Sequence, residues 1–468
     1  MSERTASAIR PREADLLVLG AGPAGAGAAY RAARSGRGVA VVERASGPGG
    51  AARSLTVGGQ SVDLGSHRLH PSIRPAILEE LRALLGDELQ LRPRRGRIRI
   101  AGRWVGFPLK PADAARNLPP SFLAGAVRDA AARPFRRERE DTFAGVLRAG
   151  LGPAICDAFY FPYARKVWGV DPERLSAEQA RRRVGARSPA RMAARVLGRK
   201  GSRFWYPAGG YGRISEALAS AAAAEGADFR YGRTVERLTV RAGGVVAALD
   251  DGSEVAAARA WSTIPLTALA GLCDPSPPSR VLDAARSLRF RAMVLVYLVV
   301  ARDRYTEFDA HYLPEEWTPV TRFSEPKNYR DGADPPGRTV LCFEIPCDPG
   351  SRTWTATDED LASLALAALS DSDLPVPDVS EVVTHRLSHA YPVYERGFEG
   401  PLDELHAWID AQARLLTFGR QGLFVHDNAH HALAMAWDAA GCLEPGGGFN
   451  EARWLRARES FAEHVVED

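Results

Sequence analysis

Three glycines at the end of an apolar run have the spacing of a phosphate-binding turn. The run Asp15–Leu19 is followed by Gly20, Gly22 and Gly25 in the pattern G-x-G-x-x-G. The first glycine permits a tight turn out of a strand, the second lets the backbone approach a pyrophosphate, and the third lets the next helix pack on the sheet. That helix then presents unpaired N–H groups and a positive dipole end to the phosphates.

An acidic residue stands where an adenosine ribose needs a hydrogen-bond acceptor. Glu43 ends a second apolar run, residues 39–43, and follows Gly25 by 18 residues. A glycine triplet alone also occurs in ordinary turns. Strand, glycines, helix and acid in this order predict a dinucleotide-binding β-α-β unit.

Arginine is concentrated in one stretch of the chain. Residues 181–203 contain many arginines and no acidic residue. Such a run is usually a solvated helix face, and alternatively it forms a basic rim that attracts an anionic substrate or an anionic membrane surface. Because a guanidinium offers two parallel donors to phosphate oxygens, Arg183 is a candidate substrate contact.

The elements that must position these residues alternate between two kinds of segment. Hydrophobic periodicity predicts an α/β fold in which nucleotide-binding segments at 10–73, 205–272 and 386–468 are separated by two insertions. Residues 74–204 are mainly helix-patterned, with a strand-like interruption at 97–105, and residues 273–385 favour a β-rich substrate domain. A helix is expected from about 428 to 440.

Composition excludes several classes of protein. The chain has 468 residues, 45% hydrophobic and 25% charged, with a net charge of +4, which gives no general argument for nucleic acid. The N-terminus lacks a signal-peptide core, and the apolar stretch 292–301 is too short to cross a bilayer. Five cysteines without C-x-x-C spacing predict reduced thiols in a cytoplasm. The pair His67 and His70 lacks a third ligand nearby, so no metal is expected.

The order of motifs resembles the FAD-dependent superfamily of amine oxidases, protoporphyrinogen-oxidase-like proteins and UDP-galactopyranose mutases. The resemblance covers nearly the whole chain and implies a Rossmann-type FAD-binding domain interleaved with the two insertions. Four segments are similar to motifs of the mutase branch: 65–70 to G-x-H-x-x-H, 163–169 to Y-x-x-K-x-W-G, 321–327 to T-R-x-x-E-x-K and 391–393 to Y-Y-P-V.

Two segments depart from the mutase branch. That branch carries adjacent tyrosines and an aspartate where this chain reads His426 to His431, and the turn 206–213 is closer to the oxidase and dehydrogenase branches. Both departures weaken the transfer of mutase activity.

The resemblance implies a set of contacts to FAD. Turns at 49–54 and 419–420 are expected along the cofactor, together with the helix that opens at Asn428. The cofactor-binding residues implied are Gly20, Gly22, Pro23, Ala24, Gly25, Glu43, Arg44, Gly50, Ala51, Arg53, Ser54, Gly65, Ser66, His67, Val235, Gly419, Arg420, Asn428 and Ala429.

The same resemblance places catalytic and substrate residues. His70 is expected beside the flavin ring and His426 on the opposite side; the alternative for each histidine is a hydrogen bond to a backbone carbonyl at a turn. Arg322 is expected at a phosphate, and an ion pair with Glu325 is its alternative. Substrate contacts are expected from the residues Tyr163, Trp168, Arg183, Tyr211 and Tyr391. For the two aromatic residues of the Y-x-x-K-x-W-G motif, a place in the core is the alternative.

Three functions follow from these expectations. We favour an FAD-dependent oxidoreductase acting on a polar small molecule that contains a sugar or a phosphate, in cell-envelope or specialised metabolism. The second is a sugar-nucleotide mutase that uses reduced flavin, with a sugar nucleotide as substrate. The third is a non-catalytic flavin-binding partner subunit. No nucleic-acid partner and no integral membrane segment are expected, and peripheral membrane contact is an open alternative.

Overall fold

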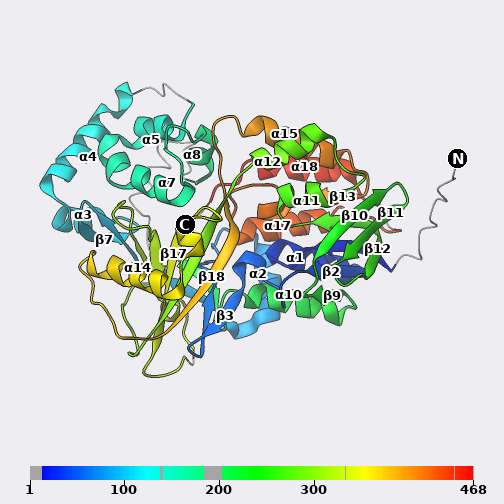
Figure 1. Cartoon of the computed structure of the whole chain (residues 1–468), viewed down its shortest axis with the longest axis horizontal. Coiled ribbons are helices and arrows are strands. Elements are labelled where there is room, and N and C mark those ends of the chain that lie inside the picture. Colours follow the sequence, from blue (N-terminus) through cyan, green and yellow to red (C-terminus); the bar gives the residue numbers. More distant parts are fainter. Residues whose placement is uncertain (1–12, 137–140, 184–202, 333, 447, 467–468) are drawn as a thin grey trace.

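Two β-sheets and a separate group of helices make up the molecule (Figure 1). The computed structural model describes residues 13–136, 141–183, 203–332, 334–446 and 448–466. Most of the arginine-rich stretch, residues 184–202, therefore lies outside the described residues. In Figure 1 the sheet that contains β10 to β12 lies at one end, and the helices α4 to α8 gather at the other.

The first sheet begins with the strands on either side of the glycine turn. Its order is β13-β10-β11-β12-β1-β2-β9, with β19 paired to β12, and β1 runs parallel to both β2 and β12. All of β2 and nearly all of β1 are buried, as expected for parallel strands covered on both faces. The strands are β1 Ala14–Leu19, β2 Val39–Glu43, β9 Asp228–Tyr231, β10 Val235–Arg241, β11 Gly244–Leu249, β12 Glu254–Ser262, β13 Cys273–Asp274 and β19 Leu415–Thr417.

Helices from distant parts of the sequence cover this sheet. Helix α1 (Pro23–Arg34) packs between α10 (Arg213–Ala224) and α17 (Ala429–Ala440). Alanines and glycines dominate the buried side of α1, so the neighbouring helices approach it closely. The other helices that accompany this sheet are α2 Pro75–Leu85, α11 Leu266–Leu272, α12 Ser279–Ser287, α15 Glu399–Asp410, α16 Gly419–Gly422 and α18 Glu451–Phe461.

The second sheet has seven strands in the order β18-β14-β17-β16-β15-β6-β7. Next to the edge strand β18 lies β14, whose side chains are almost all buried and which pairs antiparallel with both β17 and β18. Helices α13 (Arg352–Thr355) and α14 (Asp358–Ser370) accompany it. The strands are β6 Gly96–Ile100, β7 Arg103–Phe107, β14 Phe290–Val300, β15 Ala310–Tyr312, β16 Arg322–Ser324, β17 Thr339–Cys347 and β18 Val379–Pro392.

Two features of this sheet depend on long-range pairing. The strand-like interruption expected at 97–105 is the hairpin β6–β7, which joins the second sheet through β15. Strand β18 continues to Pro392, so the segment boundary expected between residues 385 and 386 falls inside this strand. Both segments extend the sheet beyond the range 273–385.

The remaining described elements connect the sheets or form the helical group. Two small antiparallel sheets pair β3 (Ser54–Val57) with β4 (Gln60–Asp63), and β5 (Leu89–Pro93) with β8 (Arg203–Pro207). The helical group consists of α3 Pro111–Asn117, α4 Pro120–Ala132, α5 Phe143–Leu151, α6 Pro153–Ile155, a π-helix at Cys156–Tyr160, α7 Phe161–Trp168 and α8 Ala177–Arg183. Short 3-10 turns lie at Gly50–Ala52, Gly86–Glu88, Arg133–Phe135 and Pro326–Tyr329.

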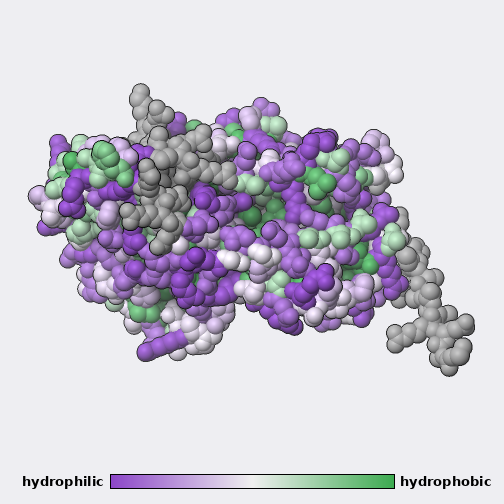
Figure 2. Space-filling model, turned by 90° about the horizontal axis from the view of Figure 1, so that it is seen from above, coloured by the Kyte–Doolittle hydropathy of each residue, from purple (hydrophilic) through white to green (hydrophobic). Residues whose placement is uncertain are grey.

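The described surface is mainly polar. The face seen in Figure 2 is largely hydrophilic, with hydrophobic residues in small separate groups. None of the described helices is long and apolar enough to cross a bilayer. The expected α/β fold class is confirmed, and the helix expected at 428–440 is α17.

Candidate active site

The first glycine turn combines two glycines that the fold requires with one that it does not. Gly20 has φ +91°, and a Cβ on Gly25 would lie 1.9 Å from the carbonyl oxygen of Gly20. Gly22 has an ordinary φ of −67°, and a Cβ there would meet only Gly50 Cα at 3.8 Å and Gly49 O at 3.9 Å. The protein itself thus has room for a side chain at Gly22, so the absence of one keeps space for a ligand.

The N-terminus of α1 and the end of β2 offer complementary groups beside this turn. No side chain caps α1, and its first turn contains no acidic residue. The carboxylate of Glu43 is 7% exposed and accepts the N–H groups of Ala21 at 2.8 Å and Ala45 at 2.9 Å. These bonds use two of about four carboxylate lone pairs. Glu43 is therefore held in place and still able to accept ribose hydroxyls.

The second glycine turn packs directly on the first. The N–H of Gly49 donates to Ala21 O at 2.8 Å, and a Cβ on Gly50, which has φ +53°, would lie 3.1 Å from Gly22 Cα. Ala51, the next residue, is exposed. The Arg53 side chain lies near His385, and its Nε is buried with no hydrogen-bond partner among the described residues.

The third turn packs against α1. Gly419 has φ +82°, and a Cβ there would lie 2.9 Å from Ala24 Cβ. Asn428 caps α17 and forms a capping box with His431, immediately before Ala429. Arg44 follows Glu43 and is exposed near His389, while Val235 starts β10 two residues after Arg233, whose N–H bonds Glu43 O. The first turn and Glu43 would suit the ADP part of FAD, and the other two turns lie next to the same helix α1 or the first turn.

A buried ion pair lies at the second sheet, beyond the glycine turns. Arg322 donates from Nε to Glu344 Oε1 at 3.0 Å and from Nη2 to Oε2 at 2.7 Å. Ser66 N also donates to Glu344 Oε1, at 2.8 Å, and a Cβ on Gly65 would lie 3.4 Å from this oxygen. Burial lowers the pKa of Arg322, but Glu344 and nearby tyrosines outweigh it and raise that pKa well above its usual value.

Tyrosines surround this ion pair. Tyr312 lies under the Arg322 guanidinium at 5.5 Å, and Tyr163 of α7 contacts the Tyr312 ring at 6.4 Å. Burial raises the pKa of Tyr163, so its hydroxyl is neutral. The two tyrosines and Arg322 form one polar wall.

Lys166 of α7 holds the loop that connects β15 to β16. Its Nζ donates to Leu313 O at 2.6 Å, Glu315 O at 2.9 Å and Val320 O at 2.6 Å. Burial lowers the pKa of Lys166 to about 7. The lysine of the Y-x-x-K-x-W-G motif is thus a positioning residue, because the loop that it ties down carries Tyr312 and Arg322 at its two ends.

Two further guanidiniums flank a third tyrosine. Arg183 lies 5.5 Å and Arg420 5.1 Å from the Tyr391 ring centroid, and Arg420 Nη2 donates to Ala390 O at 2.7 Å. Neither arginine forms an ion pair with a carboxylate within the described part of the chain. Burial lowers the pKa of Arg420, and the charge of Arg183 lowers it further. Two cations therefore face the same ring without a carboxylate ion pair among the described residues, although the Asp427 charge acts to raise the pKa of Arg420.

Most of the chain matches one protein family. A family described as flavin containing amine oxidoreductase matches residues 24–440. The chain belongs to this family. It is an FAD-dependent enzyme of the oxidoreductase type, and the three glycine turns and Glu43 are the residues that would hold FAD.

Individual relatives agree with this family. A zeta-carotene-forming phytoene desaturase from Myxococcus xanthus is 27% identical over 419 residues, which cover 82% of this chain and 74% of the relative. A reduced UDP-galactopyranose mutase has a similar structure, with a TM-score of 0.80 at 20% identity over 97% of this chain and 100% of the other. Cyclohexylamine oxidase from Brevibacterium oxydans gives 0.65 at 17% identity, over 92% and 98%. The solved structures show the shared fold.

Two residues predicted for this flavoenzyme's site, Ser54 and Tyr211, take part in structural contacts. Ser54 Oγ donates to Asp63 at 2.7 Å and accepts from Gly212 N at 2.8 Å. Tyr211 is 2% exposed and its N–H also donates to Asp63. Tyr206 completes this buried network through its hydroxyl. The network fixes the second glycine turn against the turn before α10, so Ser54 and Tyr211 act there as positioning residues.

The two histidines of the G-x-H-x-x-H motif lie in different surroundings. The His67 Nε2 lies 2.9 Å from Ala51 O, and its ring contacts Tyr211. Burial lowers the pKa of His67, and Arg322 is near enough to lower it further. His70 instead pairs with Ser72 through Nδ1 at 2.7 Å and lies 5.8 Å from the His430 ring. The structure thus brings His67, rather than His70, to Arg322.

His426 and Trp168 belong to one buried cluster. His426 is fully buried, its Nε2 lies 2.9 Å from Gln179 Nε2 and 3.1 Å from Gln179 Oε1, and its ring meets those of Trp168 and Tyr394. Burial, followed by the charges of Arg183 and Arg420, lowers the pKa of His426 well below its usual value. A neutral, glutamine-bound imidazole of this kind is a poor proton acceptor, which favours the structural alternative for His426. Trp168 is 4% exposed and lies in the core.

The ion-pair partner predicted for Arg322, Glu325, was wrong, and its actual partner, Glu344, was not predicted. Arg322 pairs with Glu344, while Glu325 accepts bonds from Tyr305 N, Thr306 N and Thr339 Oγ1. Glu344 was missed, although a single acid inside the apolar run 339–347 is a visible signal for a buried partner. Its pairing to Arg322 requires the register of β16 against β17.

Proposed function

We propose that this enzyme oxidises a small polar molecule with an anionic group, such as a phosphate, and that Arg183 and Arg420 bind this group beside Tyr391. The observation that supports the proposal is the pair of guanidiniums without carboxylate partners within the described residues. Bringing two cations together is unfavourable unless an anion compensates them. A phosphate accepts parallel donors from guanidiniums and removes that cost.

The polar wall around Arg322 supports a polar substrate. Arg322, Tyr312 and Tyr163 supply donors on one side of the same region, and both Arg322 and Tyr163 lie near Tyr391. A polar substrate could share hydrogen bonds with these groups, whereas a hydrocarbon substrate would bring no polar partner to this wall. Bound FAD supplies a hydride acceptor. The side chains contribute by orienting the substrate and by holding its charge.

A basic pocket adjoins this wall on the hairpin β6–β7. It is lined by Arg94, Arg97 and Lys110, among others, and the Arg97 guanidinium lies 4.6 Å from the Trp104 ring and 4.7 Å from the Phe308 ring. Arg94 Nη2 is 3.4 Å from the Tyr312 hydroxyl, which Arg322 also approaches. The pocket therefore extends the cationic surface away from Arg322, as a substrate with a second polar end would need.

The test uses FAD-loaded full-length protein and matched substrates with and without a phosphate. Anaerobic loss of flavin absorbance reports oxidation of each compound. Arg420→Met should raise the KM for a phosphorylated substrate about 10-fold or more, because a charge-assisted hydrogen bond contributes about 1.5–3 kcal/mol. The KM for its unphosphorylated counterpart should change little.

Arg181→Met is the matched control. Arg181 lies on α8 near Arg183 but is 39% exposed and faces Asp141 at 3.5 Å, so its removal should leave both KM values within about twofold, as expected for an exposed pair. Equal effects of Arg420→Met on both substrates, or oxidation of apolar compounds alone, would refute the proposed anion site.

A sugar-nucleotide isomerase that uses reduced flavin is the second candidate. The four mutase-like segments and the structural similarity to UDP-galactopyranose mutase favour it. Interconversion of pyranose and furanose forms that appears only after reduction with dithionite would support this function. Substrate-dependent bleaching without added reductant supports the oxidase. The five cysteines are free and buried, in line with the cytoplasmic location that we also propose.

A further inference from the structure

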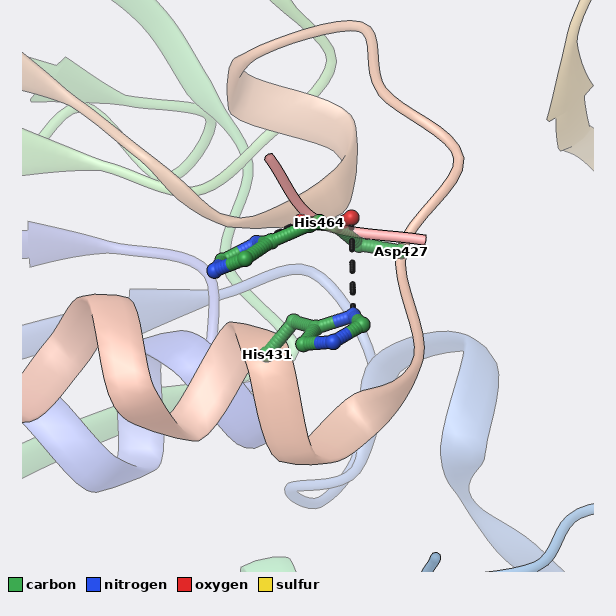
Figure 3. A group of neighbouring side chains, drawn as sticks. All are labelled: Asp427, His431 and His464. Atoms are coloured by element: carbon green, nitrogen blue, oxygen red, sulfur yellow. Dashed lines mark hydrogen bonds and ion pairs between the residues drawn. The ribbon is translucent and has the colours of Figure 1, made fainter. Parts of the chain in front are cut away.

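A buried carboxylate and two imidazoles meet at the start of α17. Asp427 precedes the helix, His431 lies in its first turn, and His464 follows α18 (Figure 3). One ligand atom from each of the three residues lies within 4.8 Å of the others. The two imidazole rings stack at 4.2 Å with an angle of 11°, and each turns a nitrogen toward the carboxylate. Two distant segments of the chain thus converge on one acid.

The carboxylate is buried, and the Arg182 and Arg420 guanidiniums are near enough to interact with its charge. The Asp427 side chain is 0% exposed, and its Oδ2 lies 3.0 Å from His464 Nδ1. Its Oδ1 accepts no hydrogen bond within the described residues and lies 3.5 Å from His431 Nδ1. That Nδ1 accepts the Asn428 N–H at 3.3 Å with its single lone pair. A carboxylate oxygen and an unprotonated imidazole nitrogen are both electron-pair donors, so together they suit a metal cation.

We propose that Asp427, His431 and His464 bind a divalent transition-metal ion, with Zn²⁺ as the best fit. Ligand atoms about 2.0–2.1 Å from a tetrahedral zinc lie about 3.3 Å apart. The distances of 3.0 and 3.5 Å from the carboxylate to the two Nδ1 atoms bracket this value. Imidazole and carboxylate ligands suit zinc, and a water completes the fourth position. On binding, the two rings turn out of their stack, because a metal lies close to the plane of each imidazole ligand, and His431 Nδ1 exchanges the Asn428 bond for the metal.

The role of this ion is structural. It ties the segment after α18 to the first turn of α17, which packs on the dinucleotide-binding helix α1. His430 extends the group, since its ring lies 4.0 Å from His431 and its Nε2 lies 3.3 Å from Ser72 Oγ. Zinc therefore stabilises the C-terminal part of the chain rather than acting on substrate.

The test measures zinc binding to untagged full-length holoprotein after removal of metal with a chelator. Calorimetric titration with Zn²⁺ should show one tight site, and the thermal midpoint should rise when zinc is added. His464→Gln should weaken binding about 100-fold or more, because loss of a group that only supports a ligand already costs 10–100-fold. His406→Gln removes a histidine of α15 outside the cluster and should leave the affinity unchanged.

The result does not depend on turnover, so it is independent of the proposed substrate. Absence of a one-to-one zinc site in the wild-type chain, or equal affinity in the wild type and His464→Gln, would overturn the proposal. If Asp427→Asn fails to fold, the His464→Gln comparison still decides the question, because His464 lies near the end of the chain.

Discussion

Gly22→Ala separates the needs of the cofactor from those of the fold. Gly22 has an ordinary φ of −67°, and an added Cβ would approach its nearest protein atoms only at 3.8 and 3.9 Å. The variant should therefore fold. Its methyl group would occupy the place where the backbone approaches the FAD pyrophosphate, so FAD affinity should fall.

The size of the loss follows from the bonds at stake. A hydrogen bond from a backbone N–H to a charged phosphate contributes about 1.5–3 kcal/mol. Displacing the pyrophosphate enough to lose one such bond corresponds to about a 10- to 100-fold weaker FAD affinity, and losing two corresponds to about 100- to 20,000-fold, since 1.4 kcal/mol is a factor of ten. Gly22→Val adds two more carbon atoms and should abolish flavin retention.

The assay is the titration of flavin-free protein with FAD, followed by flavin fluorescence. Gly271→Ala in α11 is the control, because no heavy atom lies within 4 Å of its Cβ position and its φ is also ordinary. Circular dichroism should show the same secondary structure in all three proteins. Wild-type FAD affinity in a folded Gly22→Ala variant would refute the placement of the pyrophosphate at this turn.

Three further predictions follow from the contacts. Gly25→Ala should fail to give folded protein, because its Cβ would lie 1.9 Å from Gly20 O; recovery of native circular dichroism would contradict this. Lys166→Met leaves three carbonyls without their donor and should lower stability by about 3 kcal/mol in urea unfolding, whereas exposed Lys110→Met should not. Burial lowers the pKa of His406 to about 3, so below about pH 6.5 the unfolded chain binds the extra proton and stability falls by up to about 1.4 kcal/mol per pH unit. His406→Gln should flatten this dependence between pH 7.5 and 5.5, and an unchanged slope would show that another group causes it.

Local sequence determined the cofactor turn and most of the elements. Backbone geometry at Gly20 and the clash at Gly25 depend on a few neighbouring residues, so their spacing was enough to predict the β-α-β unit. Periodicity also predicted the helix at 428–440, which is α17, because such a pattern is a property of the segment itself.

The family resemblance identified motif residues but did not predict which contacts each of them makes. Lys166 and Ser54 stand in recognisable motifs, yet each uses its hydrogen bonds to hold backbone in place. A motif records which residue type is present. It does not record which acceptors the fold brings within 3 Å.

Tertiary structure alone decided the charge pairing and the histidine group. Arg322 finds Glu344 because β16 pairs with β17 in one register, and Arg183 meets Arg420 because two distant segments converge on Tyr391. His464 reaches Asp427 only through the packing of α18. Electrostatic interactions fall off over a few ångströms, and sequence separation says nothing about such distances, so these contacts required the folded chain.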